Sequence, residues 1–247
     1  SAALYIENNN AHSLFRVHDK PDADRLTAFT SYLGEVGIPH SIVEGASPAD
    51  FTAVVSKTRG RPDQELIQTM LLRSMKRAVY DCDNIGHFGL ALDAYAHFTS
   101  PIRRYPDVMV HRLLQHYLDG GKSASEDEFE NKCQHSSYME NLATKAERDS
   151  IKYMQVKYME DHKDEEFPGV ISGVTEWGIY VEILANKCEG MVRIRDIKDD
   201  YYIFDEKQFA VIGQATNAMI QLGDYVTVKV KHTDLERKHL DFELIED

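Results

Sequence analysis

The fold of this chain is decided by the stretch Gly169-Val-Ile-Ser-Gly-Val-Thr-Glu-Trp-Gly-Ile-Tyr-Val-Glu-Ile-Leu184. It predicts two short strands, at 169–176 and 178–184, because β-formers alternate on either side of the Trp-Gly pair. In the second strand Ile179 and Val181 point to one face of the sheet, while Tyr180 points to the other. The pattern therefore separates an apolar face from one that carries an aromatic side chain.

Three more short strands are predicted after this stretch, at 189–194, 225–232 and 239–244, separated by Gly-containing turns and one irregular insertion. Five short strands within roughly 80 residues are typical of a small closed barrel. We therefore predict an α+β protein with two domains. A mostly helical domain spans 1–163, and a small five-stranded barrel spans 164–247.

Apolar residues at helical spacing predict the helices of the first domain. They lie between residues 22 and 36, after Ser47-Pro48, from about 63 to 78, after Pro106, and from about 125 to about 162. The fourth helix is predicted to start after Pro106, because a proline disfavours helical geometry at the residue before it. Residues 86–92 are predicted to be a strand or an extended segment, and no element is predicted at 1–10.

The composition is that of a globular protein, with 43% hydrophobic and 28% charged residues. No apolar run approaches the ~20 residues of a membrane span, so we expect no membrane partner. The three cysteines are odd in number and lack metal-ligand spacing. They predict reduced core thiols and a cytoplasmic location.

A second informative stretch is Tyr95-Ala-His-Phe-Thr-Ser-Pro-Ile-Arg-Arg-Tyr-Pro-Asp107, and we call its residues 100–104 the arginine turn. Two adjacent arginines lie beside the hydroxyls of Thr99 and Ser100 and a helix start, which suits them to hold a phosphodiester. Residues 73–112 carry six Lys or Arg against four acids, although the formal net charge of the chain is -13. This contrast indicates a local basic site and not a basic surface.

The barrel stretch, together with Glu189-Gly-Met-Val-Arg-Ile194, resembles the opening of the S1-type RNA-binding domain, an OB-fold barrel. The resemblance implies that Trp177 and Tyr180 are platforms on which RNA bases stack, each worth ~1–3 kcal/mol per base. It also implies that Arg193, where the S1 family usually has histidine, places a cation near the RNA backbone. The alternative is that both aromatics are ordinary half-buried barrel residues.

The second stretch is similar to the most distinctive segment of the RNB domain of the RNase II and RNase R exoribonucleases. Further similarity lies at 17–21, 60–76, 86–92 and 135–149, so it covers essentially the whole chain and is greatest to RNase R. The resemblance implies a monomeric 3′→5′ exoribonuclease that hydrolyses RNA processively to nucleoside 5′-monophosphates. Its partners would be single-stranded RNA 3′ ends, and its cofactor would be Mg²⁺.

Motif positions imply the site residues. Arg103 corresponds to the catalytic arginine of the family, and its permanent charge and planar fork suit a phosphate transition state. Glu147 corresponds to a glutamate that helps to position the 3′-terminal nucleotide. Ser100, Arg104 and Tyr105 are expected to contact RNA.

Each assignment has a structural alternative. Arg103 could pair with Asp107, Arg104 could be structural, and Glu147 could form an ion pair on the helix surface with Lys145 or Arg148. His97, His111 and His135 have spacings that fit no local metal motif, which favours structural, hydrogen-bonded histidines.

The metal centre of the family is a cluster of the type Asp-x-x-Asp-x-Asp-Asp, and no stretch of this sequence matches it. The resemblance therefore implies a C-terminal fragment that consists of the later part of an RNB domain and its S1 barrel. We expect the Mg²⁺ ligands N-terminal to this chain, no metal ligands within it, and no hydrolysis by the chain on its own. The competing hypothesis is a non-catalytic RNA-binding module. A hydrolase built on histidines is a third and weaker one.

Overall fold

The computed structural model describes residues 2–9, 11–61, 63–205 and 208–245. The chain forms two compact units that are not contiguous in sequence. The first comprises Ser1–Thr30, Ile38–Lys57 and Leu71–Thr144, and the second comprises Ser31–Gly37, Thr58–Met70 and Lys145–Asp247. The predicted boundary between residues 163 and 164 stays a prediction. Within the described ranges, no helix has the length and apolar character needed to cross a bilayer.

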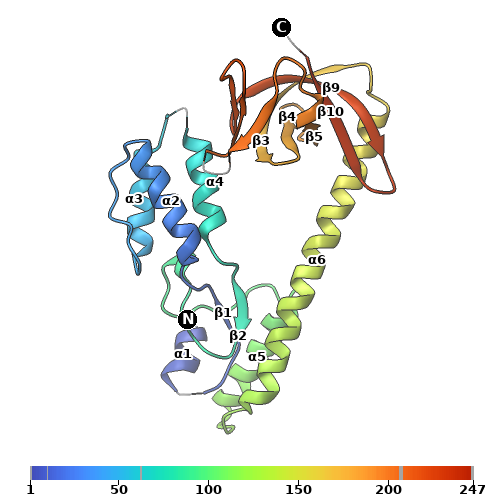
Figure 1. Cartoon of the computed structure of the whole chain (residues 1–247). Helices are drawn as coiled ribbons and strands as arrows, with labels where there is room; N and C mark the ends of the chain where they lie inside the picture. Colours follow the sequence, from blue (N-terminus) through green and yellow to red (C-terminus); the bar gives the residue numbers. More distant parts are fainter. Residues whose placement is uncertain (1, 10, 62, 206–207, 246–247) are drawn as a thin grey trace. The chain divides into compact units, whose positions relative to one another are not determined.

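Most of the helices precede the barrel strands along the chain, and the protein has the predicted α+β class (Figure 1). The helices are α1 Ala2–Asn8, α2 Ala23–Glu35, α3 Pro48–Lys57, α4 Gln64–Ser74, α5 Tyr105–Leu118 and α6 Glu126–Glu160. Five of them were predicted, whereas α1 was not. The α4 helix ends at Ser74 and not near residue 78.

The start of α5 corrects one prediction. The helix begins at Tyr105 and carries Pro106 in its first turn, although we predicted a start after that proline. The N–H groups of a first turn have no acceptor within the helix, so a proline there removes no hydrogen bond. After the helix, Gly120 adopts a φ of 83°, which favours glycine and ends the element as expected.

Residues 86–92 are not a strand, which is a second correction. They form a tight loop around the 3₁₀ turn Phe88–Leu90, and the N–H groups of His87 and Phe88 donate to the carbonyls of Leu92 and His18. The strands of this unit are β1 Phe15–Val17 and β2 Val79–Asp81, an antiparallel pair that was not predicted. Each of these strands has three residues, which is too few for an alternation of apolar and polar side chains to be recognised in the sequence.

The core of the first unit gathers side chains from α1, the β1–β2 pair, α5 and α6. Its buried members include Ile6, Tyr80, Val110 and Cys133. All three cysteines of the chain are buried and none forms a disulfide, as predicted for core thiols. The Sγ atoms of Cys82 and Cys133, distant in sequence, lie 3.7 Å apart.

The second unit contains the predicted barrel, which closes in the strand order β10-β5-β4-β3-β9. Its strands are β3 Glu166–Thr175, β4 Gly178–Ile183, β5 Glu189–Arg193, β9 Tyr225–Asp234 and β10 His239–Ile245, drawn in yellow to red in Figure 1. Ile179, Val181 and Ile183 are fully buried in the barrel core, and Phe242 is buried with them. The alternation predicted for the second strand is therefore confirmed.

The insertion between β5 and β9 is regular, which corrects the prediction of an irregular segment. After a 3₁₀ turn at Ile194–Asp196 it forms an antiparallel sheet of β6 Tyr202–Asp205, β7 Ala210–Gly213 and β8 Met219–Gln221. Asp200 fixes the turn between β7 and β8, because its carboxylate accepts hydrogen bonds from Ala215 N, Thr216 N and Thr216 Oγ1. These strands have three or four residues each, so their alternation is hidden in the sequence.

Candidate nucleic-acid interface

The arginine turn is held to the first turn of α5 by one buried carboxylate. Asp107 has no solvent exposure, and its Oδ2 accepts hydrogen bonds from Ser100 N at 2.6 Å and from Arg104 Nη2 at 3.0 Å. Arg104 Nε lies 3.0 Å from Asp107 Oδ1, close enough for an ion pair but without the alignment of a hydrogen bond. Within the turn, Arg103 N and Arg104 N both donate to Ser100 O. The backbone that carries the two arginines is therefore rigidly placed.

The two adjacent arginines have different environments. Arg104 pairs with Asp107, whereas Arg103 is exposed and its side chain has no hydrogen bond or ion pair with any residue that the structure describes. The alternative that Arg103 pairs with Asp107 is therefore excluded. Beside it, Ile102 is fully exposed. The turn thus presents the Arg103 side chain to solvent from a fixed backbone.

The other residues at this turn that were predicted to contact RNA differ in how much of each side chain is available to a ligand. Tyr105 is 61% exposed at the start of α5, so its ring is available to a ligand. Ser100 is half-buried, and its backbone N–H is used by Asp107. Arg104 keeps Nη1 without a partner in the described part of the chain, and a contact of this atom with RNA stays a prediction.

His97, which lies close enough to Arg104 of the turn to sense its charge, belongs to a network of aromatic and ionic contacts. Tyr80 Oη and His97 Nδ1 form a hydrogen bond of 2.9 Å, and Arg16 lies over the Tyr80 ring while both its terminal nitrogens donate to Glu140. Burial, followed by the nearby Arg104 and Arg16 guanidinium groups, lowers the pKa of His97 to about 4. His97 is therefore neutral at pH 7 and serves as a hydrogen-bonded structural side chain.

The predicted structural role also holds for His111, whose Nε2 donates to the Phe98 carbonyl at 2.7 Å while its ring stacks on that of Phe98. For His135 no side-chain hydrogen bond is found with the described residues.

Glu147 lies on the exposed surface of α6. Over the described ranges it forms no ion pair with Lys145 or Arg148, so the structural alternative for this residue finds no support. Glu147 belongs to the second unit and Arg103 to the first, so the two predicted catalytic residues are not brought together within one unit.

The barrel presents the predicted aromatic residues on its surface. Trp177 lies in the tight turn between β3 and β4 and is 71% exposed. The glycine after it is required by close packing, because a Cβ on Gly178 would lie 2.2 Å from the carbonyl oxygen of Val192 on β5. Tyr180 is half-buried and lies over Gly173 of the paired strand. Trp177 is thus free for stacking, and Tyr180 offers only part of its ring.

Arg193 is held within the barrel. Its Nη2 donates to Asp241 Oδ2 at 2.6 Å, and Asp241 is buried at the closing strand β10. The predicted contact of Arg193 with RNA stays a prediction, and this ion pair restricts the orientation that the guanidinium can adopt.

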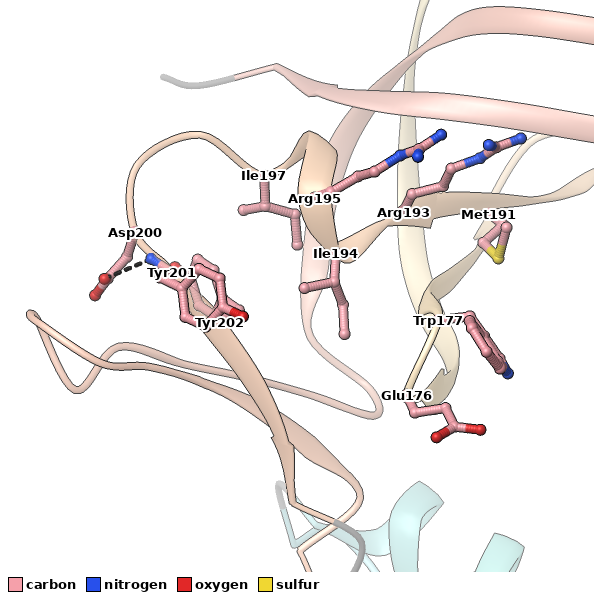
Figure 2. A pocket seen from close by; sticks show the side chains of 10 residues that line it. All are labelled: Glu176, Trp177, Met191, Arg193, Ile194, Arg195, Ile197, Asp200, Tyr201 and Tyr202. Atoms are coloured by element: carbon pink, nitrogen blue, oxygen red, sulfur yellow. Dashed lines mark hydrogen bonds between the residues drawn. The ribbon is translucent and has the colours of Figure 1, made fainter.

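A pocket of about 720 Å³ opens beside Trp177 (Figure 2). We call it the Trp177 pocket, and its lining includes Trp177, Met191, Arg193, Arg195 and Tyr201. No role was assigned to Arg195 or Tyr201 from the sequence. The Tyr201-Tyr202 pair was the signal that could have pointed to this pocket.

No group of three or more His, Cys, Asp or Glu side chains that could hold a metal ion occurs among the described residues. The described side chains therefore form no Mg²⁺ centre of the kind that the family resemblance implies.

Comparison with known proteins assigns the chain to a family. Residues 1–120 match the RNB domain, and residues 160–245 match the S1 RNA binding domain. Over its whole length the chain is 40% identical to Ribonuclease R of Vibrio cholerae. The chain belongs to the RNase II/RNase R family. Ribonuclease R of Aquifex aeolicus, another member, is also 40% identical over the whole chain.

The chain covers 32% of the Vibrio cholerae protein and 35% of the Aquifex aeolicus one, about a third of each relative. Among solved structures, RNase R of Mycoplasma genitalium in complex with ribose methylated single-stranded RNA superposes with a TM-score of 0.88 at 27% identity. That match covers 99% of this chain and 39% of the other chain. The predicted RNase II/RNase R resemblance and the predicted fold class are both confirmed.

Proposed function

We propose that this chain is part of a 3′→5′ exoribonuclease that degrades single-stranded RNA processively and releases nucleoside 5′-monophosphates. The observation that carries the proposal is the arginine turn. Asp107 holds its backbone through Ser100 and Arg104, and Arg103 points outward without a carboxylate partner in the described chain. A cation that extends from a fixed backbone and has no ion-pair partner suits a developing charge on a phosphate.

In this proposal Arg103 contacts the scissile phosphate. Its planar fork can donate two hydrogen bonds to phosphate oxygens, which a lysine cannot do with the same geometry. Glu147 positions the 3′-terminal nucleotide. Ser100, Tyr105 and the free Nη1 of Arg104 contact the strand nearby. The barrel binds RNA upstream through Trp177, Tyr180 and Arg193. Membership of the family and the RNA-bound relative support these roles.

Hydrolysis would need a metal-activated water, and Mg²⁺ would supply it. The described residues offer no suitable ligand cluster, so we propose that the ligands lie outside these 247 residues. The chain alone then binds RNA and hydrolyses none. We further propose that the protein acts in the cytoplasm as a monomer.

The test uses the product of the complete reading frame that contains this sequence, incubated with 3′-labelled single-stranded RNA with and without Mg²⁺. We expect release of labelled mononucleotide that depends on Mg²⁺. Arg103→Ala should abolish release while RNA affinity stays within a factor of about three, since one of many contacts is lost. Arg112→Ala, which removes an exposed arginine of the following helix α5, is the matched control and should behave as wild type.

RNA binding without any mononucleotide release would reject the exonuclease and leave the non-catalytic RNA-binding module. If Arg103→Ala weakens binding while turnover is preserved, the role given to Arg103 is wrong.

A further inference from the structure

We propose that the Trp177 pocket binds two bases of one RNA strand, with Tyr201 as the second stacking platform and Arg195 as the phosphate-binding cation. This inference rests on the proposed RNA binding by the barrel and adds a site formed by the insertion. The pocket, about 720 Å³, is within the range of small-ligand sites.

Two exposed aromatic side chains, Trp177 and Tyr201, line this pocket from different elements, beside the buried Tyr202. Trp177 extends from the β3–β4 turn, and Tyr201 precedes β6 of the insertion; each is 71% exposed. Ile194 and Ile197 lie between them (Figure 2). A large exposed indole and an equally exposed phenol beside apolar side chains suit the flat, apolar faces of unpaired bases.

Tyr201 is exposed because its neighbour is anchored. Tyr202 is buried, and its hydroxyl donates to Asp199 at 2.8 Å. Successive side chains of an extended segment point to opposite sides, so an inward Tyr202 forces Tyr201 outward. The backbone of Tyr201 is fixed on both sides, since its N–H donates to Asp200 and its carbonyl accepts from Gln214 N. The ring is therefore presented by a rigid backbone.

The acidic residues near Tyr201 do not prevent an RNA contact. Asp200 lines the pocket, but its carboxylate is occupied by hydrogen bonds from Thr216 Oγ1, Thr216 N and Ala215 N. Its side chain points away from Trp177 in Figure 2. Asp199 is occupied by the Tyr202 hydroxyl. Both carboxylates thus serve the fold of the insertion.

Arg195 is the free cation of this pocket. Arg193 is held by Asp241, and the acid next to Arg195 in sequence, Asp196, pairs with Lys231 Nζ at 2.9 Å. Arg195 itself is exposed and has no ion pair in the part of the chain that the structure describes. Figure 2 places the two arginines at the end of the pocket opposite to Glu176. A phosphate is therefore expected at the arginine end, away from the Glu176 carboxylate.

The test uses the 247-residue chain and a six-nucleotide oligoadenylate without Mg²⁺. Trp177 is the single tryptophan of the sequence, so quenching of its fluorescence reports a base stacked on it. Tyr201→Ala should raise the Kd by about 5- to 150-fold, the effect of losing one stacked base, and Tyr201→Phe should restore wild-type affinity. Arg195→Ala should reduce the slope of log Kd against log salt by about 0.7, the loss of one phosphate contact.

Two controls match these changes. Tyr225→Ala removes a tyrosine that is 77% exposed on β9 and does not line this pocket. Arg237→Ala removes an arginine whose side chain is 77% exposed, with Asp234 3.9 Å away. In both control variants the Kd should stay within a factor of about two of the wild-type value, and the slope of log Kd against log salt should be unchanged.

The outcomes separate this inference from the proposed function. Wild-type affinity in Tyr201→Ala and Arg195→Ala, with Trp177 still quenched, would overturn the two-base pocket and leave RNA binding by the barrel intact. Absence of any RNA response in the wild-type chain would overturn both. Loss of affinity in Tyr201→Phe as well as Tyr201→Ala would show that the phenol acts by its hydroxyl or by the fold, and would also reject stacking.

Discussion

Replacing Asp107 by alanine would test whether one buried carboxylate holds the arginine turn. The side chain has no exposure and accepts hydrogen bonds from Ser100 N and Arg104 Nη2. Without it, the Arg104 guanidinium loses its counter-charge and the Ser100 N–H loses its acceptor. We therefore expect lower stability and a loosened turn around Arg103.

The size of the effect follows from the exposure of the partners. Removing one member of a buried ion pair costs ~3–5 kcal/mol, because the other charge is left without compensation. The Arg104 side chain is 22% exposed and can recover part of its hydration, so the lower end of that range applies. We expect Asp107→Ala to lower the free energy of unfolding by about 3 kcal/mol. Asp107→Asn keeps an acceptor for Ser100 N and should cost about 2 kcal/mol.

The measurement is urea unfolding followed by circular dichroism at 222 nm, where helices dominate the signal. With a slope near 3 kcal/mol per molar urea, the midpoint should fall by about 1 M in Asp107→Ala. Fluorescence of Trp177, which belongs to the second unit, is recorded in the same samples as an internal reference. Asp83→Ala removes an exposed carboxylate from the first unit and should change stability by less than about 0.5 kcal/mol.

A loss below about 1 kcal/mol in Asp107→Ala would refute the reasoning, because it would mean that Arg104 and Ser100 find equivalent partners elsewhere. The Arg104→Gln/Asp107→Asn double variant gives a second check. It should lose less stability than the sum of the single variants if the two side chains interact as the geometry indicates.

Further predictions concern packing, pH and thiol chemistry. Gly178→Ala should lower the stability of the barrel by about 1–3 kcal/mol in thermal unfolding, because the new methyl group meets the Val192 carbonyl at 2.2 Å. Gly34→Ala, in the last turn of α2 and with no atom within 4 Å of the new methyl group, should instead raise stability by up to about 1 kcal/mol. The lowered pKa of His97, about 4, means that the unfolded chain takes up the proton first as pH falls from about 6.5 to 4. Wild type should lose stability in that window and His97→Gln should lose less of it, as urea midpoints at pH 7 and 5 would show. Burial raises the pKa of Cys133, so a colorimetric thiol reagent at pH 8 should label the native chain slowly and all three cysteines rapidly in urea.

The barrel was predictable from sequence because its signals are local. Ile179, Val181 and Ile183 alternate with Tyr180 as the pleat requires, and each of the five strands was placed within a few residues. The tight loop at Phe88–Leu90 was missed because long-range bonds, such as that from Phe88 N to His18 O, fix it. Short strands such as Phe15–Val17 were missed because they are defined by pairing with a strand distant in sequence, here Val79–Asp81.

The candidate site divides in the same way. The sequence could place two arginines in one turn, yet their separate roles depend on which of them Asp107 reaches. The spacing alone could not decide this, because Arg104 is three residues from Asp107 and Arg103 is four, and both spacings allow contact on a helix. The Tyr201-Tyr202 pair indicates aromatic side chains at this position, but it does not show which of the two is exposed, since that depends on Tyr202 being anchored by Asp199.

Exposure and stiffness coincide at the arginine turn, and this combination bears on proteolysis. Arg103 and the fully exposed Ile102 are open to a trypsin-like protease, which needs an extended backbone around the bond it cuts. Here Arg103 N and Arg104 N both donate hydrogen bonds to the Ser100 carbonyl. The peptide bond after Arg103 is therefore exposed, but its backbone is folded into a turn and not extended as the protease requires. The rate of tryptic cleavage at this bond therefore measures how often the turn opens, and bound RNA that uses Arg103 should slow it.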